Sequence, residues 1–209
     1  MGLMKYVFEQ AGKPRGKFGE LFAMSMNLGH SKLTRWGLSY LTVNPEDFVL
    51  DVGCGGGKTV SRLAKIAREG KVWGVDYSDA SVAAATRANR KSIDNGQVKI
   101  LKASVSELPF PGEMFDLVTA VETCYFWPDF HENLKEIYRV LKPGGSFVII
   151  NEAYKNEKFE KRNSSIANTR KFLYYLPLEF KEYFEKAGFS QIRIKTIESK
   201  NWITVIGRK

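Results

Sequence analysis

Cysteine and histidine are scarce in this chain, since each occurs only twice among 209 residues. Two cysteines, Cys54 and Cys124, are too few for the disulfide framework of a small secreted domain, and they form no zinc-binding spacing. We therefore expect no metal ion and a reducing, cytoplasmic environment.

Long apolar runs are missing as well. No stretch approaches the roughly 20 residues that a membrane-spanning helix needs, and residues 1–20 lack the apolar centre of a signal peptide. We therefore expect a chain with no membrane span.

Acidic residues are the minority charge, with 23 against 32 basic residues and a net charge of +9. An excess of positive charge suits nucleic acid, anionic lipid or an acidic substrate. However, the basic residues are dispersed, with local density only near residues 155–171, and no aromatic-plus-basic nucleic-acid signature accompanies them. We interpret the charge as a solvated basic surface and expect no nucleic-acid partner.

The chain has the length and the 44% hydrophobic content of one α/β domain. Apolar patterns from residue 47 onward alternate between strand and helix, which indicates a doubly wound, mostly parallel sheet. The predicted strands are 47–52, 71–76, 97–102, 115–121 and 145–151, and the predicted helices are 58–69, 79–94, 130–141 and 177–187.

Two alternating runs near the C-terminus, 192–196 and 202–206, are separated by a polar turn and predict an antiparallel hairpin. The chain thus divides into a helical N-terminal lid over 1–44, a core over 45–151, and a final part over 152–209. This last part comprises a substrate-side insertion, a helix and the hairpin. All three are expected to form one domain.

The glycine-rich segment 49–58 joins a predicted strand to a predicted helix, an arrangement that offers backbone N–H groups to an anionic ligand. A P-loop would need glycine where Val52 stands, and a dinucleotide-binding loop would need glycine where Lys58 stands. Both interpretations fail on spacing. What remains is the pattern Asp-x-Gly-x-Gly-x-Gly, which starts at Asp51.

This pattern resembles the first motif of the class I S-adenosylmethionine-dependent methyltransferases, and every fixed position matches. A second segment, 103–110, is similar to the Gly-Asp-Ala-x-x-Leu-Pro-Phe segment of small-molecule methyltransferases, and the block 134–145 resembles their helix and turn before the fifth strand. The likeness is strong over 45–151 and nearest to the ubiquinone- and menaquinone-biosynthesis branch. It implies a seven-stranded Rossmann-like sheet and S-adenosyl-L-methionine as cofactor.

The resemblance assigns cofactor contacts to the glycine loop, namely to Asp51, Gly53, Cys54, Gly55 and Gly57.

Further contacts are expected where the following strands end, because ligands of such sheets bind outside the carboxyl ends of the strands. Asp76 ends a strand 23 positions after Gly53, and its carboxylate can accept hydrogen bonds from both ribose hydroxyls. Tyr77 is expected either to pack on the adenosine or to be partly buried. Ser104 stands where the family has Asp and retains an uncharged acceptor for the adenine amino group, while the N–H of Val105 reaches a ring nitrogen.

The segment 122–129 follows the fourth strand and contains residues that are expected to lie near the methyl acceptor. Glu122 is expected to touch the methionine part of the cofactor. Three aromatic residues follow at 125–127, and they form either an acceptor surface or a core plug, alternatives that the sequence leaves equal. Neither the Pro-Cys of 5-methylcytosine enzymes nor the Asn/Asp-Pro-Pro-Tyr/Phe of nucleic-acid amino-methyltransferases occurs here, which disfavours a nucleic-acid acceptor.

We expect a methyltransferase that moves a methyl group by in-line displacement to a small, aromatic or apolar acceptor, leaving S-adenosyl-L-homocysteine. A general base is needed only if the acceptor must lose a proton, and the candidates are His30, Glu122 and Tyr125. Two alternatives stay open: a methyltransferase acting on protein or RNA, and a non-catalytic protein that binds the cofactor.

Overall fold

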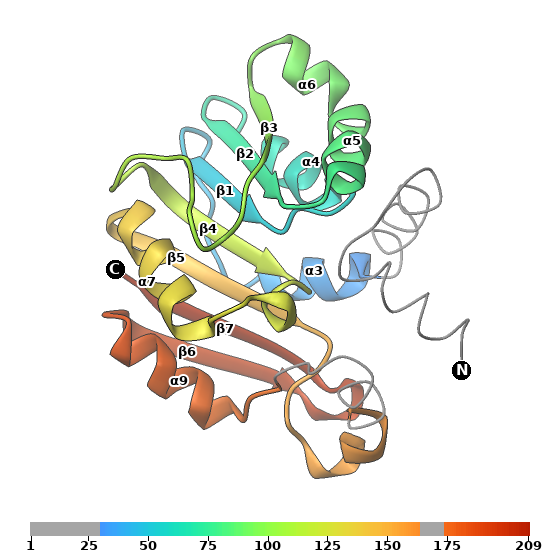
Figure 1. The fold of residues 1–209 in the computed structure, drawn as a ribbon, viewed down its shortest axis with the longest axis vertical. Helices are drawn as coiled ribbons and strands as arrows, with labels where there is room; N and C mark the ends of the chain where they lie inside the picture. The colour runs from blue at the N-terminus through green and yellow to red at the C-terminus, as the bar shows by residue number, and fades with distance from the viewer. Residues whose placement is uncertain (1–29, 164–173) are drawn as a thin grey trace.

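The computed structural model describes residues 30–163 and 174–209 (Figure 1). Most of the predicted lid over 1–44 therefore lies outside the described residues. The strands are β1 (Phe48–Val52), β2 (Lys71–Asp76), β3 (Val98–Lys102), β4 (Phe115–Val121), β5 (Leu141–Asn151), β6 (Ser190–Ile197) and β7 (Trp202–Arg208). The α-helices are α3 (Ser31–Leu38), α4 (Lys58–Ala64), α5 (Asp79–Ala88), α6 (Arg90–Asp94), α7 (Phe130–Val140) and α9 (Pro177–Lys186).

All seven strands form one sheet in the order β3-β2-β1-β4-β5-β7-β6. Strands β1 to β5 pair in parallel, whereas β7 is antiparallel to both β5 and β6. The chain proceeds outward from β1 through β2 to β3 and then returns to place β4 on the other side of β1 (Figure 1). The strand order therefore reverses between β1 and β4, which is where doubly wound sheets bind their ligands.

Helices cover both faces of the sheet, and each face has its own apolar core. One core packs α3, α4 and α5 against Val49, Leu117 and Val148, and the other packs α7 and α9 against the next residue of each strand. Burial on both sides explains why the central strands are almost continuously apolar. The predicted fold, a mostly parallel seven-stranded Rossmann-like sheet closed by an antiparallel pair, is confirmed.

Two predicted helices differ from the observed ones by more than a residue, and at each difference a side chain bonds to a backbone carbonyl of a distant segment. The helix predicted over 58–69 ends at Ala64, because Gln97 Nε2 donates to the carbonyls of Ala64 (2.6 Å) and Ala67 (3.1 Å). The helix predicted over 79–94 breaks at Asn89, whose Nδ2 donates to the Gly57 carbonyl at 3.0 Å.

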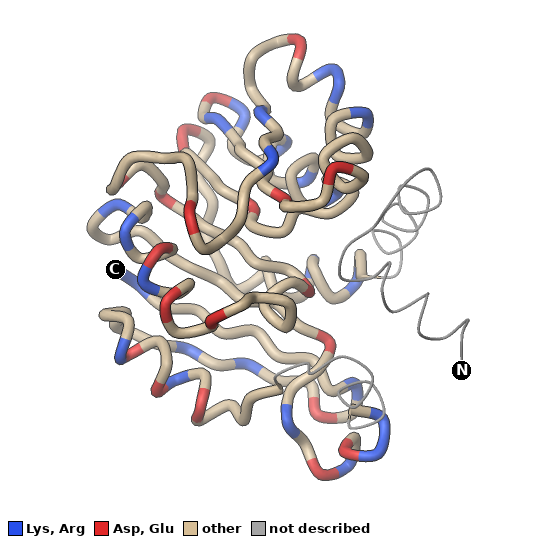
Figure 2. Tube along the Cα trace, viewed as in Figure 1, with Lys and Arg blue, Asp and Glu red and all other residues tan. Residues whose placement is uncertain are grey.

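None of the described helices is long and apolar enough to cross a membrane. Lysine and arginine alternate with aspartate and glutamate along the helices and loops of the described chain, rather than gathering on one element (Figure 2).

Candidate functional site

The glycine loop between β1 and α4 holds Gly53, Gly55 and Gly57 in left-handed backbone conformations, with φ of +71°, +53° and +77°. A side chain at Gly53 would be blocked as well as strained, because an added Cβ would lie 2.0 Å from Thr123 Oγ1. At Gly55 an added Cβ would meet nothing within 4 Å. Gly53 is therefore required for a close approach to the loop after β4, and Gly55 only for its backbone conformation.

The backbone N–H groups of this loop bond within the protein. Gly53 and Cys54 both donate to the Val75 carbonyl, at 2.8 and 2.9 Å, and Gly57 donates to the Cys54 carbonyl at 2.8 Å. Gly55 donates to Asp76 Oδ2 at 3.0 Å. The expectation that these N–H groups face an anionic ligand is wrong for these four residues, because the parallel neighbour β2 supplies acceptors for three of them.

Two buried carboxylates lie beside the loop. Asp76, at the end of β2, accepts hydrogen bonds from the N–H groups of Gly55 and Ser78, and burial raises its pKa although these bonds act against the rise. Asp51 accepts a hydrogen bond from Thr119 Oγ1 at 2.6 Å, and burial raises its pKa to about 7. Each carboxylate is held by donors of the protein rather than by a basic side chain.

A cavity of about 270 Å³ opens at the carboxyl ends of β1, β2 and β3, under the loop after β4. It is lined by Val52, Gly53, Val75, Asp76, Tyr77, Ala103, Ser104, Val105, Thr123, Phe126, Trp127 and Pro128. Five of the residues predicted to bind a cofactor are in this lining, and they come from three different strand ends: Gly53, Asp76, Tyr77, Ser104 and Val105.

The other five predicted cofactor residues do not line this cavity. Asp51 lies in β1, and Cys54, Gly55 and Gly57 lie in the loop outside the lining. Cys54 is buried, and burial raises the pKa of its thiol well above the usual range. Glu122 lies just beyond the cavity, next to Thr123 in its lining.

The aromatic segment after β4 divides between the two expected roles. Trp127 is buried, and its ring stacks on that of Phe147 with the centroids 6.3 Å apart, so it belongs largely to the core. Both Trp127 and Phe126 also line the cavity. The Tyr125 hydroxyl donates to the Ala153 carbonyl at 3.2 Å and accepts from the Ala153 N–H at 3.1 Å. These bonds tie the segment to the end of β5.

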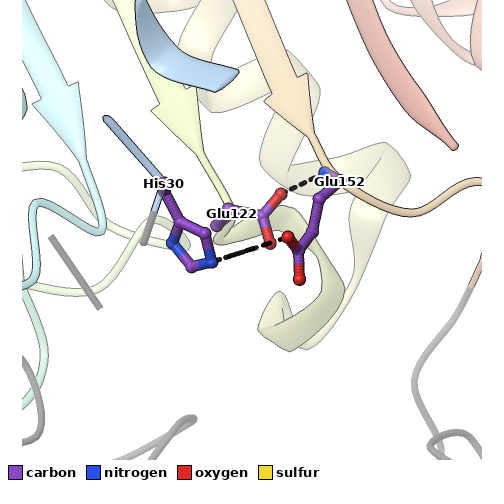
Figure 3. Close-up of side chains that lie close together, drawn as sticks. All are labelled: His30, Glu122 and Glu152. Atoms are coloured by element: carbon purple, nitrogen blue, oxygen red, sulfur yellow. Dashed lines mark hydrogen bonds and ion pairs between the residues drawn. The ribbon is translucent and has the colours of Figure 1, made fainter. Parts of the chain in front are cut away.

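Two of the three predicted catalytic residues, His30 and Glu122, lie side by side with Glu152 (Figure 3), and the hydroxyl of the third, Tyr125, lies next to Glu122. His30 Nε2 lies 3.9 Å from Glu122 Oε2, and Glu122 Oε1 lies 3.4 Å from the Tyr125 hydroxyl, as a second acceptor within reach of its single proton. Burial raises the pKa of Glu122 well above its usual range, and the charge of Glu152 raises it further. Burial also lowers the pKa of His30.

Comparison with known proteins agrees with this geometry. A family model described as a methyltransferase domain matches residues 50–149. Demethylmenaquinone methyltransferase from Listeria monocytogenes is 28% identical over 214 residues, covering 90% of this chain and 87% of that protein. The domain match and this relative support a class I S-adenosylmethionine-dependent methyltransferase, as the sequence predicted.

Two further comparisons extend this likeness, one by sequence and one by fold. An uncharacterized methyltransferase of Bacillus subtilis, YdaC, is 28% identical over 163 residues, which cover 78% of this chain and 82% of that protein. Among solved structures, a chain from the complex between the Haloferax volcanii Trm112 methyltransferase activator and a putative methyltransferase superposes with a TM-score of 0.75. It is 22% identical and covers 93% of this chain and 98% of that chain, which shows a shared fold.

Sequence reasoning missed two residues near the predicted catalytic group of this methyltransferase. Glu152 directly follows β5, and Arg162 Nη2 donates to the Glu152 carbonyl at 3.1 Å. The strand-end rule that found Asp76 and Glu122 would also have found Glu152, had it been applied to the fifth strand. No sequence signal indicates Arg162.

Cys124 is not a nucleophile in this methyltransferase. It is buried, its sulfur accepts a hydrogen bond from Asn151 Nδ2 at 3.1 Å, and burial raises its pKa to about 12. The neutral thiol has neither the charge nor the access that nucleophilic attack needs.

Proposed function

We propose that this chain binds S-adenosylmethionine in the cavity at the ends of β1, β2 and β3 and transfers its methyl group to a small molecule. The observation that carries the proposal is the position of the cavity. It lies where the strand order reverses, and Asp76 and Gly53 line it from adjacent strand ends.

The lining fits the parts of this cofactor. The Asp76 carboxylate lines the cavity and is already surrounded by hydrogen-bond donors of the protein, and ribose hydroxyls in the cavity can donate to it as well. Val105 and Ser104 offer an N–H and a hydroxyl to the adenine edge, although Ser104 Oγ already accepts from the Ser106 N–H at 3.2 Å. Tyr77 is 40% exposed and can cover the adenosine face.

Asp51 and Asp76 also suit the charge of the cofactor. Burial raises the pKa of both groups, and the negative charge of Asp76 raises that of Asp51 further. A cationic ligand beside them favours their ionised forms. The remaining three loop contacts that the resemblance assigns, at Cys54, Gly55 and Gly57, act through the shape of the loop.

The bound cofactor supplies an already activated methyl group, so the protein contributes mainly alignment. Glu122 and Thr123 follow β4, between the cavity and the group formed by His30 and Tyr125, and this arrangement favours an acceptor bound on that side. His30 is a base for an acceptor that must lose a proton, because its lowered pKa leaves the imidazole neutral at neutral pH.

A small-molecule acceptor is favoured by the aromatic side chains at the site and by the relatives. Phe126 lines the cavity, and Tyr125 lies with its ring 5.5 Å from that of Tyr174. The Listeria relative is named for a quinone, which is a flat and apolar acceptor. Basic and acidic residues are interspersed along the described part of the chain, which gives no support to an RNA acceptor (Figure 2).

The test is calorimetric titration with S-adenosylmethionine, using Asp76→Asn with Asp79→Asn as its matched control. Asp79 lies three residues further on, with a side chain that is 82% exposed and paired with Lys102. We expect Asp76→Asn to weaken cofactor binding at least tenfold and Asp79→Asn to leave it unchanged. Absence of binding to the parent chain would refute both the enzyme and the non-catalytic binding protein.

A second experiment identifies the acceptor class. The chain is incubated with isotope-labelled S-adenosylmethionine and a metabolite extract, and labelled products are detected by mass. Transfer into small molecules supports the proposal. Tight cofactor binding with no transfer to metabolites, protein or RNA would favour the non-catalytic alternative.

A further inference from the structure

Three side chains from distant parts of the sequence converge beside the cofactor cavity. His30 precedes α3, Glu122 follows β4 and Glu152 follows β5, and the imidazole points toward the two carboxylates (Figure 3). From each residue one potential ligand atom can be chosen so that the three lie within 4.8 Å of one another. We infer that these three residues form a binding site for one divalent transition-metal cation, such as Zn²⁺ or Mn²⁺.

The spacing suits an ion better than direct contacts. His30 Nε2 lies 3.9 Å from Oε2 of both Glu122 and Glu152, which is too far for a hydrogen bond. A point equidistant from three atoms so arranged lies roughly 2.3–2.5 Å from each, close to the metal–ligand distances of divalent cations. Only a small side-chain adjustment is needed to reach the shorter distances of Zn²⁺.

The protonation state also suits an ion. The two contacts of His30 would be ion pairs only if the imidazole were protonated, and burial lowers its pKa. The neutral imidazole has a lone pair for a metal. The carboxylate of Glu122, whose side chain is only 13% exposed, faces the carboxylate of Glu152. A cation between the two offsets their repulsion.

Neighbouring polar groups of the protein already orient one of the three ligand side chains. Glu122 Oε1 accepts the Glu152 N–H and lies 3.4 Å from the Tyr125 hydroxyl, so its other oxygen is turned toward His30. Such outer contacts fix ligand carboxylates in metal sites. The site lies outside the cofactor cavity, whose lining contains none of the three residues. It goes beyond the proposed methyl transfer and does not depend on it; when the ion is bound, His30 Nε2 is its ligand and is not the base for an acceptor.

One imidazole and two carboxylates also indicate which ions bind. Imidazole suits zinc and other later transition metals, carboxylate suits harder ions as well, and magnesium prefers oxygen ligands and retains its waters. We therefore expect Zn²⁺ to bind more tightly than Mn²⁺, and Mg²⁺ at least a hundredfold more weakly than Zn²⁺.

The test uses the whole chain, freed of any affinity tag and dialysed against a chelator. Each of the three chloride salts is titrated into it by calorimetry. We expect one Zn²⁺ ion per chain, and at least tenfold weaker binding in His30→Ala and in Glu152→Gln. Glu152 is half-exposed, so the Gln variant is expected to fold, and melting temperatures without metal check this. Glu182→Gln, on the exposed face of α9, is the matched control and binds as the parent does.

Two outcomes overturn the inference: no binding of Zn²⁺ or Mn²⁺, or binding that the His30 and Glu152 variants leave unchanged. Titration of Asp76→Asn separates this inference from the proposed function. That variant should keep its metal affinity while losing cofactor, whereas Glu152→Gln should lose the metal. A chain that binds metal but no cofactor would thus refute the proposed function and leave the metal site standing.

Discussion

Replacement of Gly53 by alanine tests the close approach of the glycine loop to the loop after β4. Two costs add. A non-glycine residue at φ +71° costs about 1–2 kcal/mol, and the new Cβ would lie 2.0 Å from Oγ1 and 2.6 Å from Cβ of Thr123. Such overpacking costs typically about 1–3 kcal/mol. The free energy of unfolding should therefore fall by roughly 2–5 kcal/mol.

Gly55→Ala is the matched control for this variant. Its φ of +53° imposes a similar backbone strain, but an added Cβ meets nothing within 4 Å. We expect a loss of only about 1–2 kcal/mol, measured like the first by urea unfolding. The difference between the two variants isolates the contact with Thr123.

A second substitution shows whether Thr123 causes the difference. Rotation of Thr123 moves its Oγ1 away but not its Cβ, so Thr123→Gly should relieve the clash of Gly53→Ala more fully than Thr123→Ala. In a double-mutant cycle, Thr123→Gly should make Gly53→Ala nearly as mild as Gly55→Ala. Equal losses for Gly53→Ala and Gly55→Ala, or no coupling with Thr123, would refute the reasoning.

Three further predictions concern buried polar groups. The raised pKa of Asp51 means that the folded chain holds one more proton than the unfolded chain between about pH 4 and 7. Stability therefore falls as pH rises through this window, and Asp51→Asn should flatten the fall by up to about 1.4 kcal/mol per pH unit, as urea titrations at several pH values would show. Cys54 and Cys124 should resist a thiol reagent at pH 8 until urea unfolds the chain; rapid labelling of the native protein would contradict their burial. Gln97→Ala should cost roughly 1–3 kcal/mol in urea unfolding, because the carbonyls at the end of α4 lose a donor, whereas Gln191→Ala on the exposed edge strand should cost little.

The strand ends of the cofactor site were predictable because they depend on local patterns. Apolar runs located the strands, and the doubly wound sheet brings their carboxyl ends to one edge. Asp76 and Glu122 thus fell where the sequence analysis placed them. The helix ends were less predictable, because they involve contacts between distant positions: Gln97 donates to the Ala64 carbonyl, and Asn89 donates to the Gly57 carbonyl.

The sequence alone determined the alternation of strand and helix, the glycine loop and the acidic residue that ends β2, because each depends on neighbours within a few positions. Only the tertiary structure decided what depends on distant partners. It directed the loop N–H groups to Val75 and Asp76, raised the pKa of Asp51 by burial, and brought Glu152 to Glu122 and His30. The three side chains of that last cluster lie on segments whose approach is set by the order of the strands, which no local pattern encodes.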